Sequence, residues 1–141
     1  MNPGFESPRR LHFSPSMAMF ELTVRDEFSA AHQLRGYRGS CENLHGHNWR
    51  VEVAVRGEEL DETGFLIDFR ELKAALREVL SELDHRHLNE LPAFREKNPS
   101  SENLARYIFE RLSEKLSGKP VRVFRVTVCE TERSCASFLG H

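Results

Sequence analysis

Residues 45–55 read HGHNWRVEVAV, in which ring-bearing or branched apolar side chains alternate with small or polar ones. Successive side chains of a β-strand point to opposite faces, so a two-residue period predicts a strand with one buried face. The buried face would carry His45, His47, Trp49, Val51, Val53 and Val55. Two histidines therefore share a face with the core of the predicted sheet.

A second alternation precedes this strand, in residues 20–32 with the sequence FELTVRDEFSAAH. Its apolar parity starts at the first of these residues and continues to His32. A loop rich in glycine and arginine, residues 35–43, separates the two stretches. We expect the two strands to pair antiparallel, because the return of the chain can then bring His32 opposite His45 or His47.

A turn follows the second strand, and after it the apolar residues recur at helical spacing. Asp68 is the expected N-cap of a first helix, and Glu71 completes a capping-box pattern. Residues 84–98 are expected to form a loop, and a second helix is predicted to start near residues 98–100, with a proline in its first turn, and to end before Gly118. The apolar stripes of the two helices are Phe69, Leu72, Leu76, Val79, Leu80 and Leu83, and then Leu104, Ile108, Leu112 and Leu116.

Two further strands are predicted in the last part of the chain, over residues 121–130 and roughly 134–139. The order of elements is then ββααββ. Such an order predicts an α+β fold, in which an antiparallel four-stranded sheet carries two helices on one face.

The length of 141 residues suits one domain. We expect residues 1–18 to be a mobile N-terminal extension and residues 19–141 to be that single domain. The extension contains proline, serine and arginine but no hydrophobic stretch typical of a signal peptide, so we expect a cytoplasmic protein.

The composition excludes two classes of partner. Charged residues make up 30% and the net charge is −2, with no cluster of Lys and Arg, so we expect no nucleic-acid partner. No apolar run approaches the roughly 20 residues of a spanning helix, so we expect no membrane partner. The three cysteines are an odd number, which predicts free thiols and no disulfide framework.

Three histidines on the inward parity of two paired strands are an unusual choice for core packing. A His-x-His pair alone is more often part of a polar face than a metal site. Three neutral imidazoles with an open fourth position are, however, the usual way to hold a catalytic zinc ion. We therefore predict a Zn²⁺ site made by His32, His45 and His47.

Cys41 lies four residues before His45, in a polar loop that also contains Arg35 and Arg38. Nearby cations or a zinc ion would favour its thiolate, which predicts a reactive group. Two alternatives are a buried packing residue and a fourth metal ligand, which would make the site closed and structural. Cys129 and Cys135 lie on or beside an apolar strand and are expected to be packing residues.

Two further groups could take part in chemistry. Asp84 and His85 follow the first helix, where they are either a capping feature or a pair that moves protons. Glu130 continues the parity of Phe124, Val126 and Val128, so its carboxylate would point toward the core and need a partner. That partner is either an arginine or a ligand with two adjacent N–H groups, as in a 2-amino-4-oxo-pteridine.

Six short segments, taken in their order along the chain, resemble one known enzyme family. They are FSAAHQL (28–34), CENLHGH (41–47), GFLIDF (64–69), LDHRHLN (83–89), NPSSENLA (98–105) and VCETE (128–132). Together they resemble the 6-pyruvoyl-tetrahydropterin synthase / 6-carboxytetrahydropterin synthase family. The resemblance extends from residue 20 to the C-terminus and is specific as an ordered combination.

The resemblance implies roles for individual residues and for the assembly. It makes His32, His45 and His47 the zinc ligands, Cys41 the catalytic cysteine, Asp84 and His85 its proton-transfer partners, Glu130 the pterin anchor, and Ser100 and Ser101 small hydroxyl residues near the pterin ring. It also implies the tunnelling fold, whose subunits close their sheets into a barrel. We therefore expect a homo-oligomer, a hexamer in size, with active sites at subunit interfaces.

The interval between Cys41 and His45 is three residues, which resembles the 6-carboxytetrahydropterin synthase branch. The implied activity is that of a zinc-dependent carbon–carbon lyase on 7,8-dihydroneopterin triphosphate, in queuosine biosynthesis. Two positions depart from that branch: His87 replaces a common aromatic residue, and Ser100 replaces a common threonine. The alternatives are a 6-pyruvoyl-tetrahydropterin synthase, a related pterin side-chain lyase, and a zinc-stabilised oligomeric module without catalysis.

Overall fold

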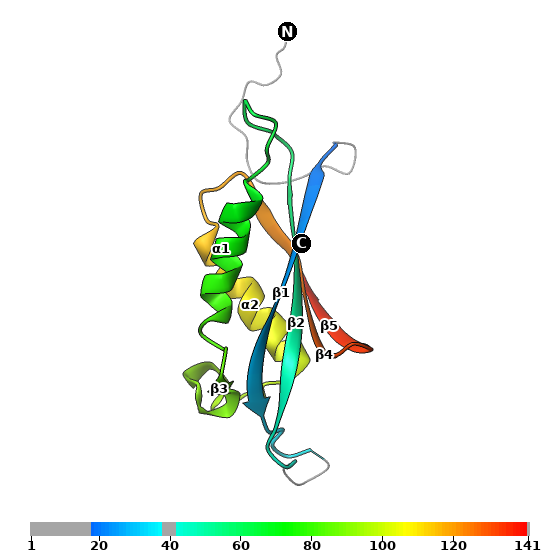
Figure 1. Ribbon diagram of the computed structural model, residues 1–141, viewed down its shortest axis with the longest axis vertical. Coiled ribbons are helices and arrows are strands. Elements are labelled where there is room, and N and C mark those ends of the chain that lie inside the picture. The colour runs from blue at the N-terminus through cyan, green and yellow to red at the C-terminus, as the bar shows by residue number, and fades with distance from the viewer. Residues whose placement is uncertain (1–17, 38–41, 141) are drawn as a thin grey trace.

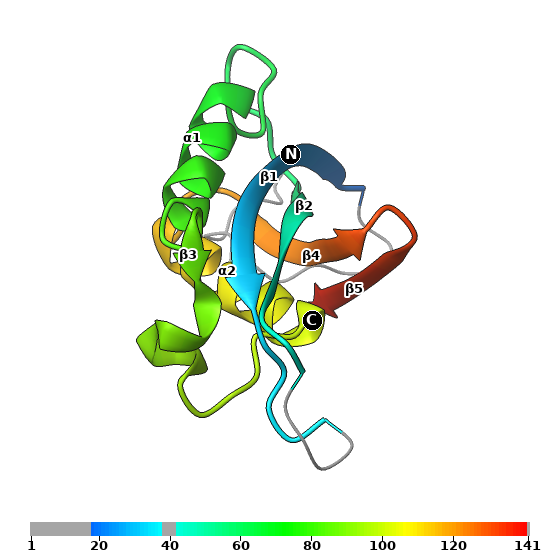
Figure 2. The ribbon, with the colours of Figure 1, turned by 60° about the horizontal axis from the view of Figure 1, so that its bottom comes forward.

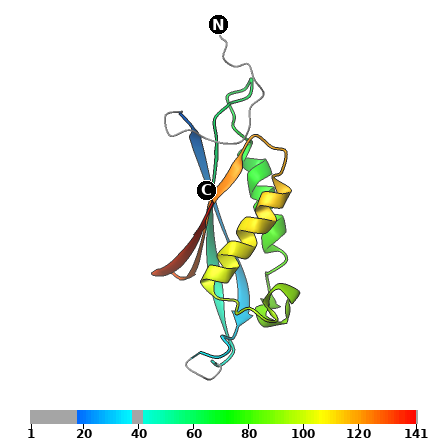
Figure 3. The same ribbon diagram turned by 180° about the vertical axis from the view of Figure 1, so that it is seen from behind.

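The computed structural model describes residues 18–37 and 42–140. It contains one five-stranded sheet in the order β3-β1-β2-β4-β5, with both helices on the same face (Figures 1 and 3). The strands are β1 (Phe20–His32), β2 (His45–Gly57), β3 (Arg86–His87), β4 (Arg122–Thr131) and β5 (Ser134–Leu139). The helices are α1 (Phe69–Leu80) and α2 (Ser101–Lys115). The predicted α+β class is confirmed. No helix in the described ranges is long and apolar enough to cross a membrane.

The four long strands match the prediction, and the fifth strand was missed. The segment expected to be a loop contains β3 and two short 3-10 helices, Leu88–Glu90 and Pro92–Phe94. β3 pairs parallel with β1, after His85 turns the chain with a φ of 59° (Figure 2). A strand of two residues has no measurable periodicity, so the local sequence pattern could not reveal it.

The capping residues determine where the helices begin. The Asp68 side chain accepts a hydrogen bond from the backbone N–H of Arg70 at 2.8 Å, so the predicted N-cap of α1 is confirmed. Glu71, the carboxylate expected to complete the capping box, makes an ion pair with Lys119 at 2.5 Å. This ion pair links the first turn of α1 to the segment that follows α2. At α2 the N-cap is Ser100, so the preceding proline lies outside the first turn in which it was expected.

Trp49 anchors the core between the sheet and the helices. Its side chain is fully buried, stacks against Phe28 with ring centroids 6.0 Å apart, and donates a hydrogen bond to the carbonyl of Ala30 at 3.2 Å. The same indole ring touches His32 and His47, with centroids 4.9 and 5.1 Å away. The buried indole ring therefore packs against both of these imidazoles.

A β-bulge changes the predicted parity of β4. Val53 pairs with Val126, and two residues further along β2 Val55 pairs with Val123, so Phe124 is the extra residue. Val123 is buried in the core, whereas Phe124 is only half-buried and lies under the guanidinium of Arg56. The expectation that Phe124 faces inward is therefore wrong, because the bulge shifts the alternation by one residue.

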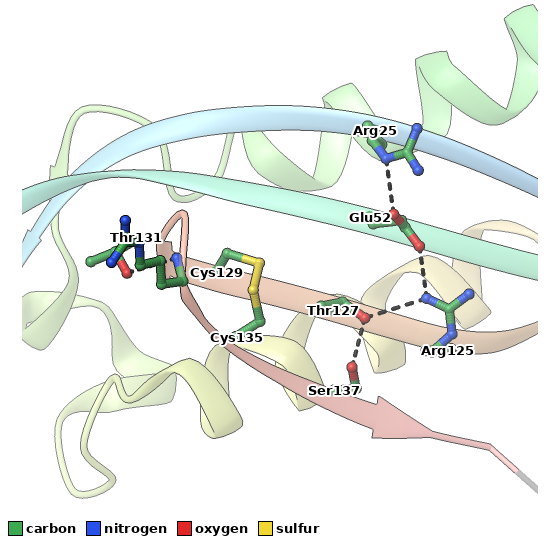
Figure 4. The surroundings of a disulfide bond; sticks show 9 residues. Arg25, Glu52, Arg125, Thr127, Cys129, Thr131, Cys135 and Ser137 are labelled. Carbon is green, nitrogen blue, oxygen red and sulfur yellow. Dashed lines mark hydrogen bonds and ion pairs between the residues drawn. A yellow bond between two sulfur atoms is a disulfide. The ribbon is translucent and has the colours of Figure 1, made fainter.

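The expectation of free packing thiols is also wrong for two of the three cysteines. Cys129 and Cys135 form a disulfide across the β4–β5 hairpin, and Cys135 is exposed (Figure 4). The hairpin register places the two residues directly opposite each other, with Cα atoms 3.9 Å apart. Their separation along the chain did not reveal this pairing, because opposition across strands depends on the position of the turn.

Candidate metal centre

The register of β1 and β2 brings the three inward histidines into one cluster. His32 lies directly opposite His45, and Ala30 lies opposite His47. The ring centroids of the three imidazoles are 4.7, 4.8 and 5.2 Å apart. His32 is only 1% exposed, so the cluster begins in the core and opens toward His45 and His47.

Backbone carbonyls orient two of the imidazoles. The Nδ1 of His32 lies 2.7 Å from the carbonyl of Pro99, and the Nδ1 of His45 lies 2.8 Å from the carbonyl of Asn43. A carbonyl can only accept, so each Nδ1 carries the hydrogen and each Nε2 presents a lone pair. These two Nε2 atoms are 3.1 Å apart. Two lone pairs so close together require a cation or a shared proton between them.

Glu130 joins the cluster from β4. Its Oε2 lies 3.2 Å from the Nε2 of His32 and 3.1 Å from the Nε2 of His47. The Nε2 of His47 is nevertheless buried without a well-formed hydrogen bond in the described part of the chain. One ligand atom from each of the four residues lies within 4.8 Å of the others. The sequence predicted an inward carboxylate at Glu130 but not its position beside the histidines.

Burial keeps His47 in the form that binds metals. The pKa of His47 is lowered, chiefly because burial penalises the charged imidazolium; Glu130 opposes this effect, and His32 and His45 reinforce it. A neutral imidazole is the ligand form of histidine, because the protonated ring has no free lone pair.

The three imidazoles fit a divalent transition metal such as zinc, and the Glu130 carboxylate borders them. Three imidazole nitrogens with an open fourth position hold a catalytic zinc ion, with Zn–N bonds of about 2.0–2.1 Å in a tetrahedral arrangement. Such bonds place neighbouring ligand atoms about 3.3 Å apart, close to the 3.1 Å between the Nε2 atoms of His32 and His45. The carbonyls of Pro99 and Asn43 orient two of these histidines in the way that outer partners orient metal ligands, and sequence reasoning missed both.

Asp84 and His85 pair with each other at the outer edge of β1. Asp84 Oδ1 lies 3.1 Å from His85 Nδ1 and accepts a hydrogen bond from the backbone N–H of Ser29 at 2.9 Å. The pKa of Asp84 is lowered, chiefly by that N–H and also by His85 and Arg77. The His85 side chain is 81% exposed. The structure therefore joins this pair to the sheet edge, with its imidazole directed to the outside of the subunit.

Cys41 and Arg38 lie outside the described residues, but both ends of their loop are held close to the cluster. The backbone N–H of Glu42 donates to the carbonyl of Leu34 at 3.0 Å. On the incoming side, Asn89 exchanges two hydrogen bonds with the backbone of Gln33. Asn98 does the same with Arg35, whose guanidinium also donates to the carbonyl of Phe94.

These two asparagines were missed as positioning residues, although both stand in segments that carry the family resemblance. A side-chain amide has both a donating NH2 group and an accepting carbonyl oxygen, so it can pair with the N–H and the carbonyl of a single backbone residue much as a neighbouring strand would.

The start of α2 adjoins the cluster. Ser100 Oγ accepts a hydrogen bond from the backbone N–H of Asn103 at 3.1 Å, and the carbonyl of Pro99 receives the Nδ1 hydrogen of His32. Ser101 is half-buried at the first position of the helix. Both predicted hydroxyl residues therefore lie within two residues of a group that orients the cluster, and their contact with a pterin stays a prediction.

The fold and the cluster define a small α+β protein with a candidate metal site. This site lies at the ends of β1, β2 and β4. The sequence matches the model of the 6-pyruvoyl tetrahydropterin synthase family over residues 21–141. The chain belongs to this family, whose enzymes are lyases acting on pterins.

Three relatives illustrate its position in the family. A putative 6-carboxy-5,6,7,8-tetrahydropterin synthase of Archaeoglobus fulgidus is 41% identical over 111 residues, which are 79% of this chain and 88% of the relative. A 6-pyruvoyl tetrahydrobiopterin synthase of Drosophila melanogaster is 35% identical over 133 residues, covering 84% of this chain and 79% of the relative. The solved 6-pyruvoyl tetrahydropterin synthase of Caenorhabditis elegans superposes with a TM-score of 0.78 at 32% identity, covering 89% of this chain and 98% of the other.

Proposed function

We propose that the protein is a zinc-dependent 6-carboxy-5,6,7,8-tetrahydropterin synthase. Its substrate would be 7,8-dihydroneopterin triphosphate, and its products 6-carboxytetrahydropterin, acetaldehyde and triphosphate, as a step of queuosine biosynthesis. The observation that carries the proposal is the clustering of the three imidazoles and the Glu130 carboxylate, with one ligand atom of each within 4.8 Å of the others. A cytoplasmic location stays an expectation from the sequence, and the Cys129–Cys135 disulfide counts against it, because disulfides are rare in a reducing compartment.

His32, His45 and His47 would hold the zinc ion through their Nε2 atoms. Bound there, zinc supplies Lewis acidity to the oxygens of the substrate side chain. Two of the three imidazoles are already oriented by carbonyls, and His32 is almost completely buried. These side chains therefore lose little conformational entropy when the metal binds.

The remaining residues would bind the substrate and move protons. Glu130 would accept two parallel hydrogen bonds from the 2-amino group and N3–H of the pterin. Its ion-pair partners in the described chain are imidazoles, so the alternative of a structural pair with arginine loses support. Cys41 as a thiolate and the Asp84-His85 pair would exchange protons with the substrate carbon.

The proton-transfer pair also bears on assembly. His85 is exposed at a sheet edge, directed away from the subunit that carries it. In a homo-oligomer whose sheets join at their edges, such a side chain would face a neighbouring subunit. This supports the expectation, drawn from the resemblance, that active sites lie at subunit interfaces.

Two features favour the carboxy-forming branch over the pyruvoyl-forming one. Identity to the Archaeoglobus relative is 41%, against 35% to the Drosophila relative. The interval of three residues between Cys41 and His45 is short, as in the carboxy-forming branch. A 6-pyruvoyl-tetrahydropterin synthase or a related pterin side-chain lyase is the second candidate, because the same cluster would serve either reaction.

Product analysis distinguishes these activities. Purified protein loaded with zinc is incubated with 7,8-dihydroneopterin triphosphate, and the pterin products and acetaldehyde are identified by mass spectrometry. We expect 6-carboxytetrahydropterin with an equal amount of acetaldehyde. Accumulation of 6-pyruvoyl-tetrahydropterin without acetaldehyde would select the second candidate. A His47→Ala preparation purified in the same way controls for contaminating activity.

A zinc-stabilised module without catalysis is the non-enzymatic alternative. It predicts a closed site, with sulfur from Cys41 in the metal coordination, stoichiometric zinc and no turnover of either pterin. X-ray absorption at the zinc edge detects sulfur ligands directly. A spectrum that fits only nitrogen and oxygen ligands, together with turnover, would exclude this alternative.

A further inference from the structure

Glu130 occupies a second β-bulge, at the turn end of the β4–β5 hairpin. Cys129 pairs with Cys135 and Thr131 pairs with Ser134, so two steps along β4 correspond to one step along β5. Glu130 is the extra residue between these pairs. A bulged residue lacks a cross-strand partner and bends its strand, which re-aims its side chain.

The bulge determines where the carboxylate points. Glu130 keeps the inward parity of Val126 and Val128, and its Oε2 reaches 3.1–3.2 Å from His32 and His47. These imidazoles are held by other elements, through β1, β2 and the start of α2. The carboxylate therefore meets the cluster only while the end of the hairpin keeps its register with the rest of the sheet.

Strand pairing with β2 reaches Cys129, which lies opposite Arg50. Beyond that pair, the contacts at this end of the hairpin other than the disulfide involve exposed groups: Arg50 pairs with Glu132 at 3.0 Å, with side chains 56% and 75% exposed, and the N–H of Arg133 donates to Thr131 Oγ1 at 3.2 Å. Exposed pairs of this kind contribute little to stability. Residues 131–135 are all exposed, and β5 is an edge strand that pairs only with β4. Cys129 precedes Glu130 and points to the opposite, helix-free face, where Cys135 meets it (Figure 4). The covalent bond thus fixes the last regular cross-strand pair before the bulge, one residue from the carboxylate.

We propose that Cys129 and Cys135 are positioning residues, whose disulfide fixes the bulge that aims Glu130 into the site. This inference rests on the proposed role of Glu130 as the acceptor of the pterin 2-amino and N3–H groups. Without the cross-link, the exposed hairpin end samples several registers and the carboxylate is less often in place. Pterin affinity falls, while the three histidines, which belong to other strands, keep their metal.

A double-mutant cycle tests the coupling between the disulfide and Glu130. Four proteins are compared: the natural chain, Glu130→Gln, Cys129→Ser with Cys135→Ser, and the triple variant. Each is titrated with biopterin, a pterin that does not react, and its zinc content is measured. We expect the serine pair and Glu130→Gln each to weaken binding about tenfold, the equivalent of one hydrogen bond to a charged group. In the triple variant, we expect no loss beyond that of Glu130→Gln alone.

Thr127→Val is the matched control on the same hairpin. Thr127 and Ser137 are bonded through their hydroxyl oxygens at 2.6 Å on the same face, two cross-strand pairs nearer the middle of the strands (Figure 4). Loss of this hydrogen bond should lower the melting temperature and leave biopterin affinity unchanged. The natural chain kept in a phosphine reductant gives the comparison without any substitution, should the serine pair fail to fold.

The outcomes separate this inference from the proposed function. If Glu130→Gln weakens biopterin binding but loss of the disulfide does not, the inference is wrong and the role of Glu130 stands. If removing the disulfide weakens biopterin binding as much in the Glu130→Gln protein as in the natural chain, its effect does not act through Glu130 and the inference is wrong. If Thr127→Val weakens biopterin binding as much as the serine pair does, the effect is a general structural one and the inference is also wrong. Unchanged affinity in Glu130→Gln itself overturns the proposed role of Glu130, and the positioning argument falls with it.

Discussion

Two imidazoles of the cluster are held by backbone carbonyls, and the third has a ring nitrogen left unsatisfied by the described residues; this difference bears on metal binding. His32 is buried and held by the carbonyl of Pro99, His45 is held by that of Asn43, and the Nε2 of His47 is buried without a well-formed hydrogen bond in the described chain. A metal ion would satisfy this nitrogen and separate the two facing lone pairs. Metal binding therefore relieves two unfavourable features of the cluster at once.

We predict that His45→Ala and His47→Ala each abolish metal retention. An open site with three protein nitrogens has no spare ligand, so the loss of one typically removes the ion. Zinc per subunit is measured by plasma mass spectrometry after dialysis against a weak chelator. His85→Ala is the matched control, because that imidazole lies at the sheet edge, and it should keep the metal. Stoichiometric zinc in both cluster variants would refute the assignment.

Cys41→Ala should keep the zinc and the fold and lose turnover. The reason is the predicted role of Cys41 as a thiolate that moves a proton, with three histidines sufficient to hold the metal. Zinc content, thermal melting and product formation are measured on the same preparation. Loss of zinc together with activity would instead favour a closed site with Cys41 as a ligand.

A polar cluster links the end of α1 to α2. Glu82, which follows α1, accepts hydrogen bonds from Tyr107 Oη at 2.6 Å and from Arg111 Nη2 at 2.6 Å. The pKa of Glu82 is lowered, chiefly by the hydrogen bond from Arg111. Burial, and then the hydrogen bond to Glu82, raises the pKa of Tyr107 to about 12. The ionised carboxylate therefore holds the two helices together.

We predict that Glu82→Gln lowers the free energy of unfolding at pH 7 by about 1–2 kcal/mol, because hydrogen bonds to a partly exposed charged group are lost. The folded pKa of Glu82 lies below the unfolded one. Its contribution is therefore fully present above the unfolded value of about 4.3 and is lost as the pH falls through the folded value. Urea unfolding at pH 7 and in steps below pH 4.5 should show the difference between variant and natural chain shrinking.

Glu78→Gln is the matched control for this prediction. Glu78 also links α1 to α2, through Lys115 at 3.0 Å, but its side chain is 68% exposed. Exposed ion pairs contribute about 0–1 kcal/mol, so this variant should change stability less. Equal effects from the two substitutions, or a Glu82 effect that does not depend on pH, would contradict the role assigned to the cluster.

The described sheet has two free edges. β5 pairs only with β4, and on the other side two-residue β3 covers a small part of β1. Unpaired backbone groups along an edge strand favour pairing with another chain. Leu139 on β5 is 54% exposed, which adds apolar surface to that edge. These features favour self-association through the sheet.

We predict a homo-oligomer, a hexamer by family resemblance, with a mass that is a multiple of the 16.3 kDa subunit. Light scattering after size-exclusion chromatography measures that mass. Leu139→Lys should shift the population to smaller species, because an edge lysine opposes strand pairing. Ala74→Lys, exposed on α1 in the helix layer, is the control and should keep the natural mass. A monomer at micromolar concentration would contradict the prediction.

The sequence alone determined the four long strands, both helices and the inward histidines, because each depends on a local period or cap. His32, His45 and His47 could be assigned to one face from alternation alone, and Asp68 could be placed at the start of a helix. Tertiary structure decided what depends on pairing between distant segments. The two bulges of β4, the disulfide, the two-residue β3 and the approach of Glu130 to the histidines all follow from inter-strand register, which leaves no periodic trace within a single segment.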